Sequence, residues 1–283
     1  MRRGAATTWL AVAAALVAGA LSVGRLLLAN GSALSTLVWA EDGLFPLCVR
    51  AHNVASCAVD PYSGYLLLVP RLVAWPVSLV PMDSWPMATN VAAAVLAALL
   101  AALAVVVLRA GGSGGVAAVV VALLPTIVPI MAFEAINVTA SVYMLLVFVA
   151  ALAVSFPPRG RFPTWAYAVG ALLVALTIPS SAILLLPLAV STLRGRIPRR
   201  GAVVTAVALV LGLVAQGAAT VLTANPRPMH WSIDALRSWA DTLPSGLLTF
   251  WPGQTELTAT GSFASSTVGW TQAGIVIAAV VLA

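Results

Sequence analysis

The sequence predicts an all-α protein: a polytopic transmembrane helical bundle with about eight membrane segments and interfacial helices in its first outer loop. Of its 283 residues, 61% are hydrophobic and only 8% are charged, whereas an ordinary soluble domain carries about 25% charged residues. The mean hydropathy is +1.05. This composition excludes a soluble enzyme and a nucleic-acid-binding protein, so the lipid bilayer is an expected partner and nucleic acid is not. Residues 1–283 are expected to form a single transmembrane domain.

Long apolar runs define the expected membrane segments. A helix needs about 20 apolar residues to cross about 30 Å of hydrocarbon. The candidate runs are 8–29, 87–108, 115–132, 138–156, 164–178, 180–193, 202–223 and 267–283. The first is no cleavable signal peptide, because Arg25 stands where small residues should lead to a cleavage site. The chain stops at Ala283 inside the last run, which fits a truncated chain or an entire protein whose last helix ends there.

A further apolar stretch, 64–80, decides the orientation of all later segments. It is short and contains Pro70, Arg71 and Pro76, so we expect an interfacial or re-entrant helix and not a span. A cytoplasmic N-terminus then satisfies the positive-inside rule and predicts a multi-pass protein of the cell membrane. The arginines expected in the cytoplasm are Arg2, Arg3, Arg109, Arg159, Arg161, Arg194, Arg196, Arg199 and Arg200.

The same topology sorts the acidic residues to the other side. Two sizeable extracytoplasmic loops result, 30–86 with an acidic motif and the interfacial helix, and 224–266. All carboxylates fall on this outer face: Glu41, Asp42, Asp60, Asp83, Glu134, Asp234, Asp241 and Glu256. Any chemistry that depends on a carboxylate is therefore expected outside the cell.

The segment 164–193 does not fit a simple span. One helix of this length would be about 45 Å long, and two halves of about 22 Å each would cross poorly. Arginines flank it on both sides, which favours an even number of passes. We expect a hairpin broken at Thr177–Ser181 that reaches only part-way; a plain proline-kinked hairpin is the alternative.

The two cysteines, Cys48 and Cys57, both lie in the first outer loop. A metal site would need more ligands than His52 between them supplies. On the oxidising side of a membrane they are candidates for a disulfide, and two free buried thiols are the alternative.

The strongest local motif is Trp39-Ala40-Glu41-Asp42-Gly43-Leu44-Phe45. Its adjacent carboxylates repel each other, so that one can keep a raised pKa while the other acts as a base. A base at the membrane surface could take a proton from a sugar hydroxyl. The simpler interpretation is that Glu41 and Asp42 favour the N-terminus of a surface helix running to about Ala55.

Two other stretches accompany this motif in order along the chain: Pro61-Tyr62-Ser63-Gly64-Tyr65-Leu66-Leu67-Leu68-Val69-Pro70-Arg71-Leu72 and Phe133-Glu134-Ala135-Ile136-Asn137. Together the three resemble the GT-C superfamily, integral-membrane glycosyltransferases that use lipid-phosphate sugars. The resemblance implies an inverting enzyme that moves a sugar from a polyprenyl-phosphate donor to an extracytoplasmic glycan, lipid or protein acceptor. Members of the superfamily usually have more spans than this chain.

Under that resemblance, Asp42 is the expected general base and Glu41 its catalytic partner. Glu41 would orient the acceptor or help Asp42 to hold a divalent metal, Mg or Mn, and the metal requirement is left open. Arg71 would neutralise the donor phosphate, or it anchors a surface helix by snorkelling.

The other site residues implied by the resemblance lie in both outer regions. Glu134, Asn137 and Tyr65 would line the outer cavity, and for the first two a polar turn between helices is the alternative. The second outer loop would contribute Arg227 and His230 to the donor phosphate and Trp231 to the cavity. Trp231 equally suits the aromatic belt at the bilayer surface.

A transporter or flippase of lipid-linked glycans or small solutes is the competing prediction, because broken helices at mid-membrane are typical of transporters. Transporters usually keep ionisable residues within their spans. Here Arg25 is the one ionisable residue inside a clear apolar run, which argues against ion-coupled transport.

Overall fold

The computed structural model describes residues 2–29, 40–127, 139, 143–157 and 164–223, and within these ranges the regular elements are helices. The all-α prediction is therefore confirmed for this part of the chain. The predicted segment 267–283 and the second outer loop lie outside the described residues.

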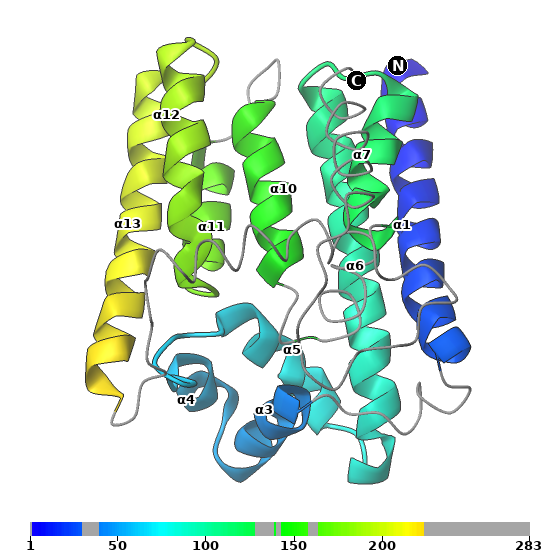
Figure 1. Cartoon of the computed structure of the whole chain (residues 1–283), viewed down its shortest axis with the longest axis vertical. Helices are drawn as coiled ribbons and strands as arrows, with labels where there is room; N and C mark the ends of the chain where they lie inside the picture. The colour runs from blue at the N-terminus through cyan, green and yellow to red at the C-terminus, as the bar shows by residue number, and fades with distance from the viewer. Residues whose placement is uncertain (1, 30–39, 128–138, 140–142, 158–163, 224–283) are drawn as a thin grey trace, which may run out of the picture.

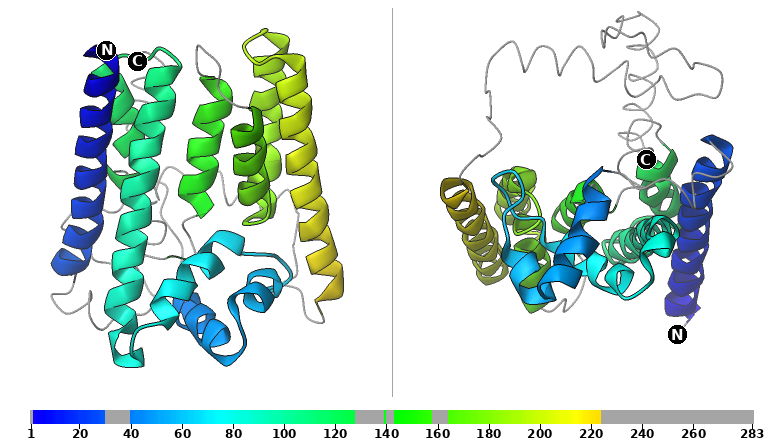
Figure 2. Two further views of the ribbon diagram at one scale, coloured as in Figure 1. Left: turned by 180° about the vertical axis from the view of Figure 1, so that it is seen from behind. Right: turned by 90° about the horizontal axis from the view of Figure 1, so that it is seen from below.

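Upright helices form the body of the molecule, and short helices lie across one end of it (Figure 1). The upright helices are α1 (Arg2–Ala29), α6 (Trp85–Ala110), α7 (Gly115–Ile127), α10 (Tyr143–Ser155), α11 (Thr164–Ala175), α12 (Leu185–Leu193) and α13 (Arg199–Leu222). Figure 2 shows α1 and α13 on opposite sides of the bundle. The start of α1, the α6–α7 turn and the α12–α13 turn share one end, which we call the basic end because it contains Arg109, Arg194, Arg196, Arg199 and Arg200.

Three helices are long and apolar enough to cross a membrane: Gly4–Gly24, Met82–Ala110 and Arg199–Leu222. Four shorter apolar helices stand beside them: Gly115–Ile127, Tyr143–Ser155, Thr164–Ala175 and Pro179–Leu193. These lengths are measured within the described residues and support a membrane protein.

Small side chains bring α1 and α6 close together. Ala14 and Ala18 of α1 are fully buried, as is Ala104 of α6, and all belong to one apolar cluster that includes α7 and α10. Apolar helices gain little from burial against each other in lipid, so close approach of small residues is the main source of their packing energy.

A second cluster joins α10 to α11, α12 and α13. Its tightest point is the crossing of α11 and α13, where a Cβ added to Gly212 would lie 2.4 Å from Ala175 Cβ. Glycine is therefore required at position 212 for the two helices to touch. Because α10 contributes to both clusters, it connects the two halves of the bundle.

The hairpin expected for 164–193 is present, and its break lies where the sequence predicts. Helix α11 ends at Ala175, Ile178 has extended backbone, and a 3₁₀ helix, η3 (Pro179–Leu184), leads into α12. The hairpin turns back beside α13, well short of the end of that helix (Figure 1). A proline at the start of η3 stops α11 from continuing, because proline disfavours helical backbone in the residue before it.

The described part of the loop that the sequence predicts to be the first outer loop, called the outer loop below, forms three short α-helices at the end opposite the basic end (Figure 1). They are α3 (Ala40–Ala51), α4 (Val54–Val59) and α5 (Leu68–Ser78), followed by the 3₁₀ turn η1 (Met82–Ser84). The interfacial helix predicted over 64–80 thus begins later, at Leu68, because residues 62–65 form a tight turn. Ser63 and Gly64 both have positive φ in that turn, 53° and 92°.

Candidate active site

Asp42 lies in the first turn of α3 and is only 2% exposed. Its Oδ2 accepts a hydrogen bond of 2.9 Å from the backbone N–H of Thr139, and its Oδ1 accepts one of 2.6 Å from the Thr139 hydroxyl. A buried carboxylate needs such donors, because burial of a charge without hydrogen bonds is costly. The contact fixes the orientation of Asp42 through a residue 97 positions away in the chain.

Thr139 is not among the site residues predicted from the sequence, although it follows the stretch 133–137 by two residues. The contact therefore connects the acidic motif to a residue that lies two positions after the third motif in the chain. A signal existed in the sequence, since Thr139 is a polar residue at the outer start of an apolar run. The sequence does not show that Thr139 binds Asp42, because that contact depends on how the helices pack.

The second motif packs against α3 through aromatic rings. Tyr62 contacts the Phe45 ring edge to face, with centroids 5.8 Å apart, and Tyr65 contacts Tyr62 in the same way at 6.3 Å. The backbone groups of Tyr62 and Tyr65 exchange two hydrogen bonds across the turn at Ser63 and Gly64. Positive φ at both central residues is the type I′ arrangement, which glycine favours. Tyr65, a predicted cavity residue, is thereby held beside α3, partly buried.

Arg71 lies in α5, is 3% exposed, and has its guanidinium carbon 5.0 Å from the centre of the Phe45 ring. Its Nη1 donates to the backbone oxygen of Cys57 and approaches the Asp60 carboxylate at 3.4 Å. Burial lowers the pKa of Arg71 from its ordinary value, and the nearby Asp60 opposes this change. Among the described residues its Nε has no hydrogen-bond partner. An unpaired buried donor of this kind is rare in proteins.

A disulfide joins Cys48 of α3 to Cys57 of α4, with an S–S distance of 2.05 Å. Cys48 and Cys57 therefore form the disulfide, and the alternative of two free thiols does not apply. The two cysteines are nine positions apart in the chain, and the bond between them fixes α4 against α3. Because Arg71 donates to the Cys57 carbonyl, the disulfide also holds one of the groups that position Arg71.

Loss of this disulfide is expected to destabilise the outer helices. The double variant Cys48→Ser/Cys57→Ser should lower the free energy of unfolding by about 2 kcal/mol, because closing a short loop restricts the unfolded chain. Thermal unfolding of the purified protein in detergent measures this change. A reducing agent should lower the melting temperature of the wild type and leave that of the double variant unchanged; an equal shift in both would contradict the assignment.

The second motif is also docked onto α13 by Gln216, which is 2% exposed. The Gln216 side chain accepts from Leu66 N–H at 2.7 Å and donates to Leu66 O at 3.1 Å and to Ala175 O at 2.9 Å. One turn further, the Thr220 hydroxyl donates to Gly64 O at 2.6 Å. Gln216 was missed from the sequence, although a lone amide within an apolar helix is a strong signal for a buried polar contact.

The break in the hairpin belongs to the same junction. Leu68 N–H donates to Leu176 O at 3.3 Å, and Val69 N–H approaches the Thr177 hydroxyl at 3.4 Å. The outer loop thus supplies partners for backbone that the end of α11 leaves free. Irregular backbone inside a bundle is tolerated where protein covers it in this way.

The structure brings together only part of the predicted site. Asp42, Tyr65 and Arg71 lie on the packed elements of the outer loop, whereas the side chain of Glu41 is not described. The remaining predicted residues lie outside the described ranges: Glu134, Asn137, Arg227, His230 and Trp231. Among the described residues no group of three or more His, Cys, Asp or Glu side chains could hold a metal ion.

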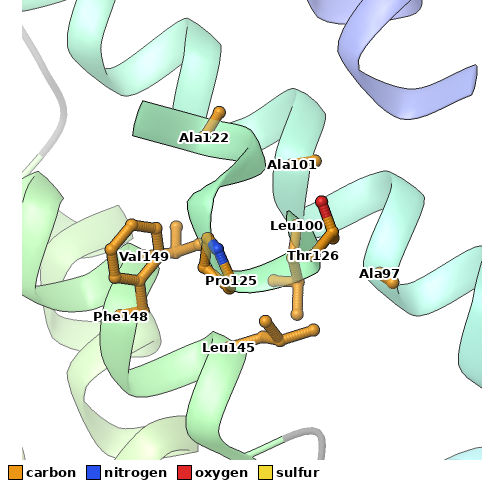
Figure 3. A pocket seen from close by; sticks show the side chains of 9 residues that line it. All are labelled: Ala97, Leu100, Ala101, Ala122, Pro125, Thr126, Leu145, Phe148 and Val149. Atoms are coloured by element: carbon orange, nitrogen blue, oxygen red, sulfur yellow. The ribbon is translucent and has the colours of Figure 1, made fainter. Parts of the chain in front are cut away.

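A pocket between α6, α7 and α10 is small and lined mostly by apolar side chains (Figure 3). Its volume of about 10 Å³ suits one water molecule. The lining residues are Ala97, Leu100, Ala101, Ala122, Pro125, Thr126, Leu145, Phe148 and Val149.

The chain matches no protein-family model, no curated protein and no solved structure. The resemblance to the GT-C superfamily therefore rests on the three sequence motifs, their order along the chain and the predicted topology.

Proposed function

We propose that the protein is a membrane-embedded inverting glycosyltransferase that uses a polyprenyl-phosphate sugar and an extracytoplasmic acceptor. The observation that supports this best is the packing of α3, with its acidic motif, against parts of the chain near the other two motifs. Asp42 of α3 binds Thr139, and Phe45 of the same helix contacts both Tyr62 and Arg71. Helix α3 thus carries the Asp42 carboxylate and, through Phe45, contacts the guanidinium of Arg71 at one end of the bundle.

In the proposed reaction Asp42 takes the proton of an acceptor hydroxyl as that oxygen attacks the anomeric carbon. The bond from this carbon to the phosphate oxygen breaks on the opposite face of the sugar, which inverts its configuration, and the phosphate leaves with the bonding electrons. Each carboxylate oxygen has two acceptor positions, and the hydrogen bonds from Thr139 use one on each oxygen. Thr139 orients the base, and Glu41 positions the acceptor.

Arg71 would stabilise the charge that grows on the leaving phosphate. Its guanidinium is anchored by Cys57 O and Asp60, and its Nε donor has no partner among the described residues. Guanidinium groups bind phosphate oxygens with strong charge-assisted hydrogen bonds. A fixed cation at this point costs no reorganisation during the reaction, which favours catalysis by charge stabilisation. A divalent metal bound there would be held by Glu41 and Asp42 and would supply further positive charge.

The proposed membrane arrangement has about eight segments and a cytoplasmic N-terminus. The orientation is supported by the gathering of Arg109, Arg194, Arg196, Arg199 and Arg200 at the basic end, as positive-inside sorting requires. The helices α3, α4 and α5 would then lie at the outer surface, and the hairpin α11–α12 would enter from the cytoplasm and turn back within the membrane.

Cysteine labelling tests this arrangement directly, because both native cysteines are in the disulfide. Asp83 and Arg200 are both exposed, at opposite ends of the molecule. A membrane-impermeant maleimide added to intact cells should label Asp83→Cys and should label Arg200→Cys only after the membrane is opened. Labelling of Arg200→Cys in intact cells would overturn the proposed orientation.

A transporter or flippase of lipid-linked glycans is the second candidate, and the observed helix break at Thr177–Ser181 favours it. The two candidates differ in one measurable product. Membranes containing the protein should transfer a labelled sugar from a polyprenyl-phosphate donor to acceptor. Movement of labelled donor across the bilayer without any transfer would support the transporter and overturn the enzyme.

A further inference from the structure

A groove at the basic end is independent of the candidate active site. It has a volume of about 500 Å³ and lies between the end of α10 and helix α12. Its lining residues are Ser155, Phe156, Leu186, Pro187, Val190, Ser191, Arg194 and Arg196. Pockets that bind small ligands are commonly of this size.

The turn after α12 holds two arginines at the mouth of this groove. Gly195 has a φ of +67°, and its N–H donates to Thr192 O while the N–H of Arg196 donates to Ser191 O. This is the Schellman motif, in which a left-handed residue ends the helix and reverses the chain. Because the motif fixes the backbone on both sides of Gly195, it sets the positions of Arg194 and Arg196 relative to α12.

Side-chain contacts join this turn to α10. The Ser191 hydroxyl donates to Val154 O at 2.8 Å, and Arg196 Nη1 donates to Ser155 O at 3.3 Å. Arg196 keeps further N–H donors on its guanidinium, which has five in all. The groove is therefore a built surface between two helices and not a loose loop.

No carboxylate of the described residues neutralises these arginines. The described acidic side chains are Asp42, Asp60 and Asp83, which all belong to the outer loop at the opposite end. Arg194 and Arg196 are exposed, and the ion pair found among the described residues involves neither of them. Within the part of the chain that the structure describes, the mouth of the groove therefore carries a positive charge that no carboxylate neutralises, and such a charge attracts anions.

An apolar stripe leads away from the arginines along the same helix. Ile183, Leu186, Val190 and Leu193 are all exposed, with Leu193 87% exposed, and their spacing places them on one side of η3 and α12. An inorganic anion would contact only the arginines. A molecule with an anionic head and an apolar tail would contact both the arginines and the stripe.

We propose that this groove binds an anionic phospholipid of the cytoplasmic leaflet. Its phosphate lies between Arg194 and Arg196, and an acyl chain follows Leu186 and Val190. Basic pockets between membrane helices on the cytoplasmic side bind acidic headgroups in this way. The site itself follows from the groove, and only the choice of leaflet rests on the proposed function and its orientation.

Native mass spectrometry of the full chain in detergent, titrated with phosphatidylglycerol, tests the proposal. The wild type should bind phosphatidylglycerol more tightly than phosphatidylcholine, and millimolar inorganic phosphate should not displace it. The variant Arg194→Gln/Arg196→Gln should bind phosphatidylglycerol about thirtyfold more weakly, since each arginine near a lipid surface contributes about 1 kcal/mol. No sugar donor is present, so failure here is distinct from failure of the transferase assay.

The matched control is Arg199→Gln/Arg200→Gln, which removes the same charge from exposed residues at the same end but outside the groove. It should leave binding unchanged. Equal weakening by both double variants, no weakening by the groove variant, equal binding of the two lipids, or displacement by phosphate would each overturn the proposal. If loss of the Arg196 bond to Ser155 unfolds the double variant, Arg194→Gln alone should still weaken binding about fivefold, and unchanged binding by that variant would overturn the proposal.

Discussion

Asp42→Asn is expected to reduce sugar transfer at least a hundredfold while the protein keeps its fold. General base catalysis contributes about 10²–10⁴-fold to rate, and asparagine cannot accept the proton of the acceptor hydroxyl. The measurement is transfer of a labelled sugar from polyprenyl phosphate by membranes that contain equal amounts of each protein.

Because asparagine can form both hydrogen bonds to Thr139, this variant tests what the negative charge of Asp42 contributes. The amide oxygen of the substituted side chain can accept from the Thr139 N–H, as Asp42 Oδ2 does now. The amide nitrogen can donate to the Thr139 hydroxyl, because a hydroxyl accepts as well as donates. Both contacts to Thr139 are thus retained while the negative charge is lost. The expected change in melting temperature is correspondingly small.

Asp83→Asn is the matched control, since Asp83 is an exposed carboxylate in η1 on the same outer loop. It should transfer sugar at the wild-type rate. Full activity of Asp42→Asn at normal protein levels would remove Asp42 from the chemistry and leave its contact with Thr139 as a purely structural link. The variant Glu41→Gln, measured beside it, separates the contribution of the second carboxylate of the motif.

The helices of this protein could largely be predicted from sequence, because apolar runs bounded by polar turns determine where they lie. The run 87–108 became α6, 202–223 became α13, and the break at Thr177–Ser181 was visible in its proline and serines. The short length of 64–80 and its prolines and arginine also predicted that it is not a span, and the structure has α5 lying across the end of the bundle.

The contacts that build the candidate site could not be predicted in the same way. Helices such as α10 and α13 are apolar on all sides, so the hydrophobic pattern does not indicate which side faces a neighbour. The partners of Asp42 and Leu66 lie 97 and 150 residues away. Such pairings follow from helix rotation and close packing, as at Gly212 against Ala175, and these depend on the whole bundle.

Gln216→Leu is expected to cost about 3 kcal/mol of stability, the largest structural effect we anticipate. Leucine fills a similar volume but cannot replace the three hydrogen bonds of the amide to Leu66 and Ala175. A buried backbone group left without its partner costs about 1–3 kcal/mol. Thermal unfolding in detergent should therefore show a melting temperature lower by roughly 6–12 °C, at about 2–4 °C per kcal/mol for a protein of this size class.

The local consequence distinguishes loss of this junction from general weakening of the bundle. Amide exchange at Leu66 should accelerate strongly in Gln216→Leu, because its N–H loses the acceptor that now lies 2.7 Å away. Exchange within α6 should change little, since that helix packs in the other apolar cluster. Val214→Leu, an exposed change two residues earlier on α13, is the control and should leave both measurements at wild-type values. Unchanged exchange at Leu66 in Gln216→Leu would show that the turn at 62–65 is held by Thr220 and the hairpin break alone, and that Gln216 does not anchor the candidate site to α13.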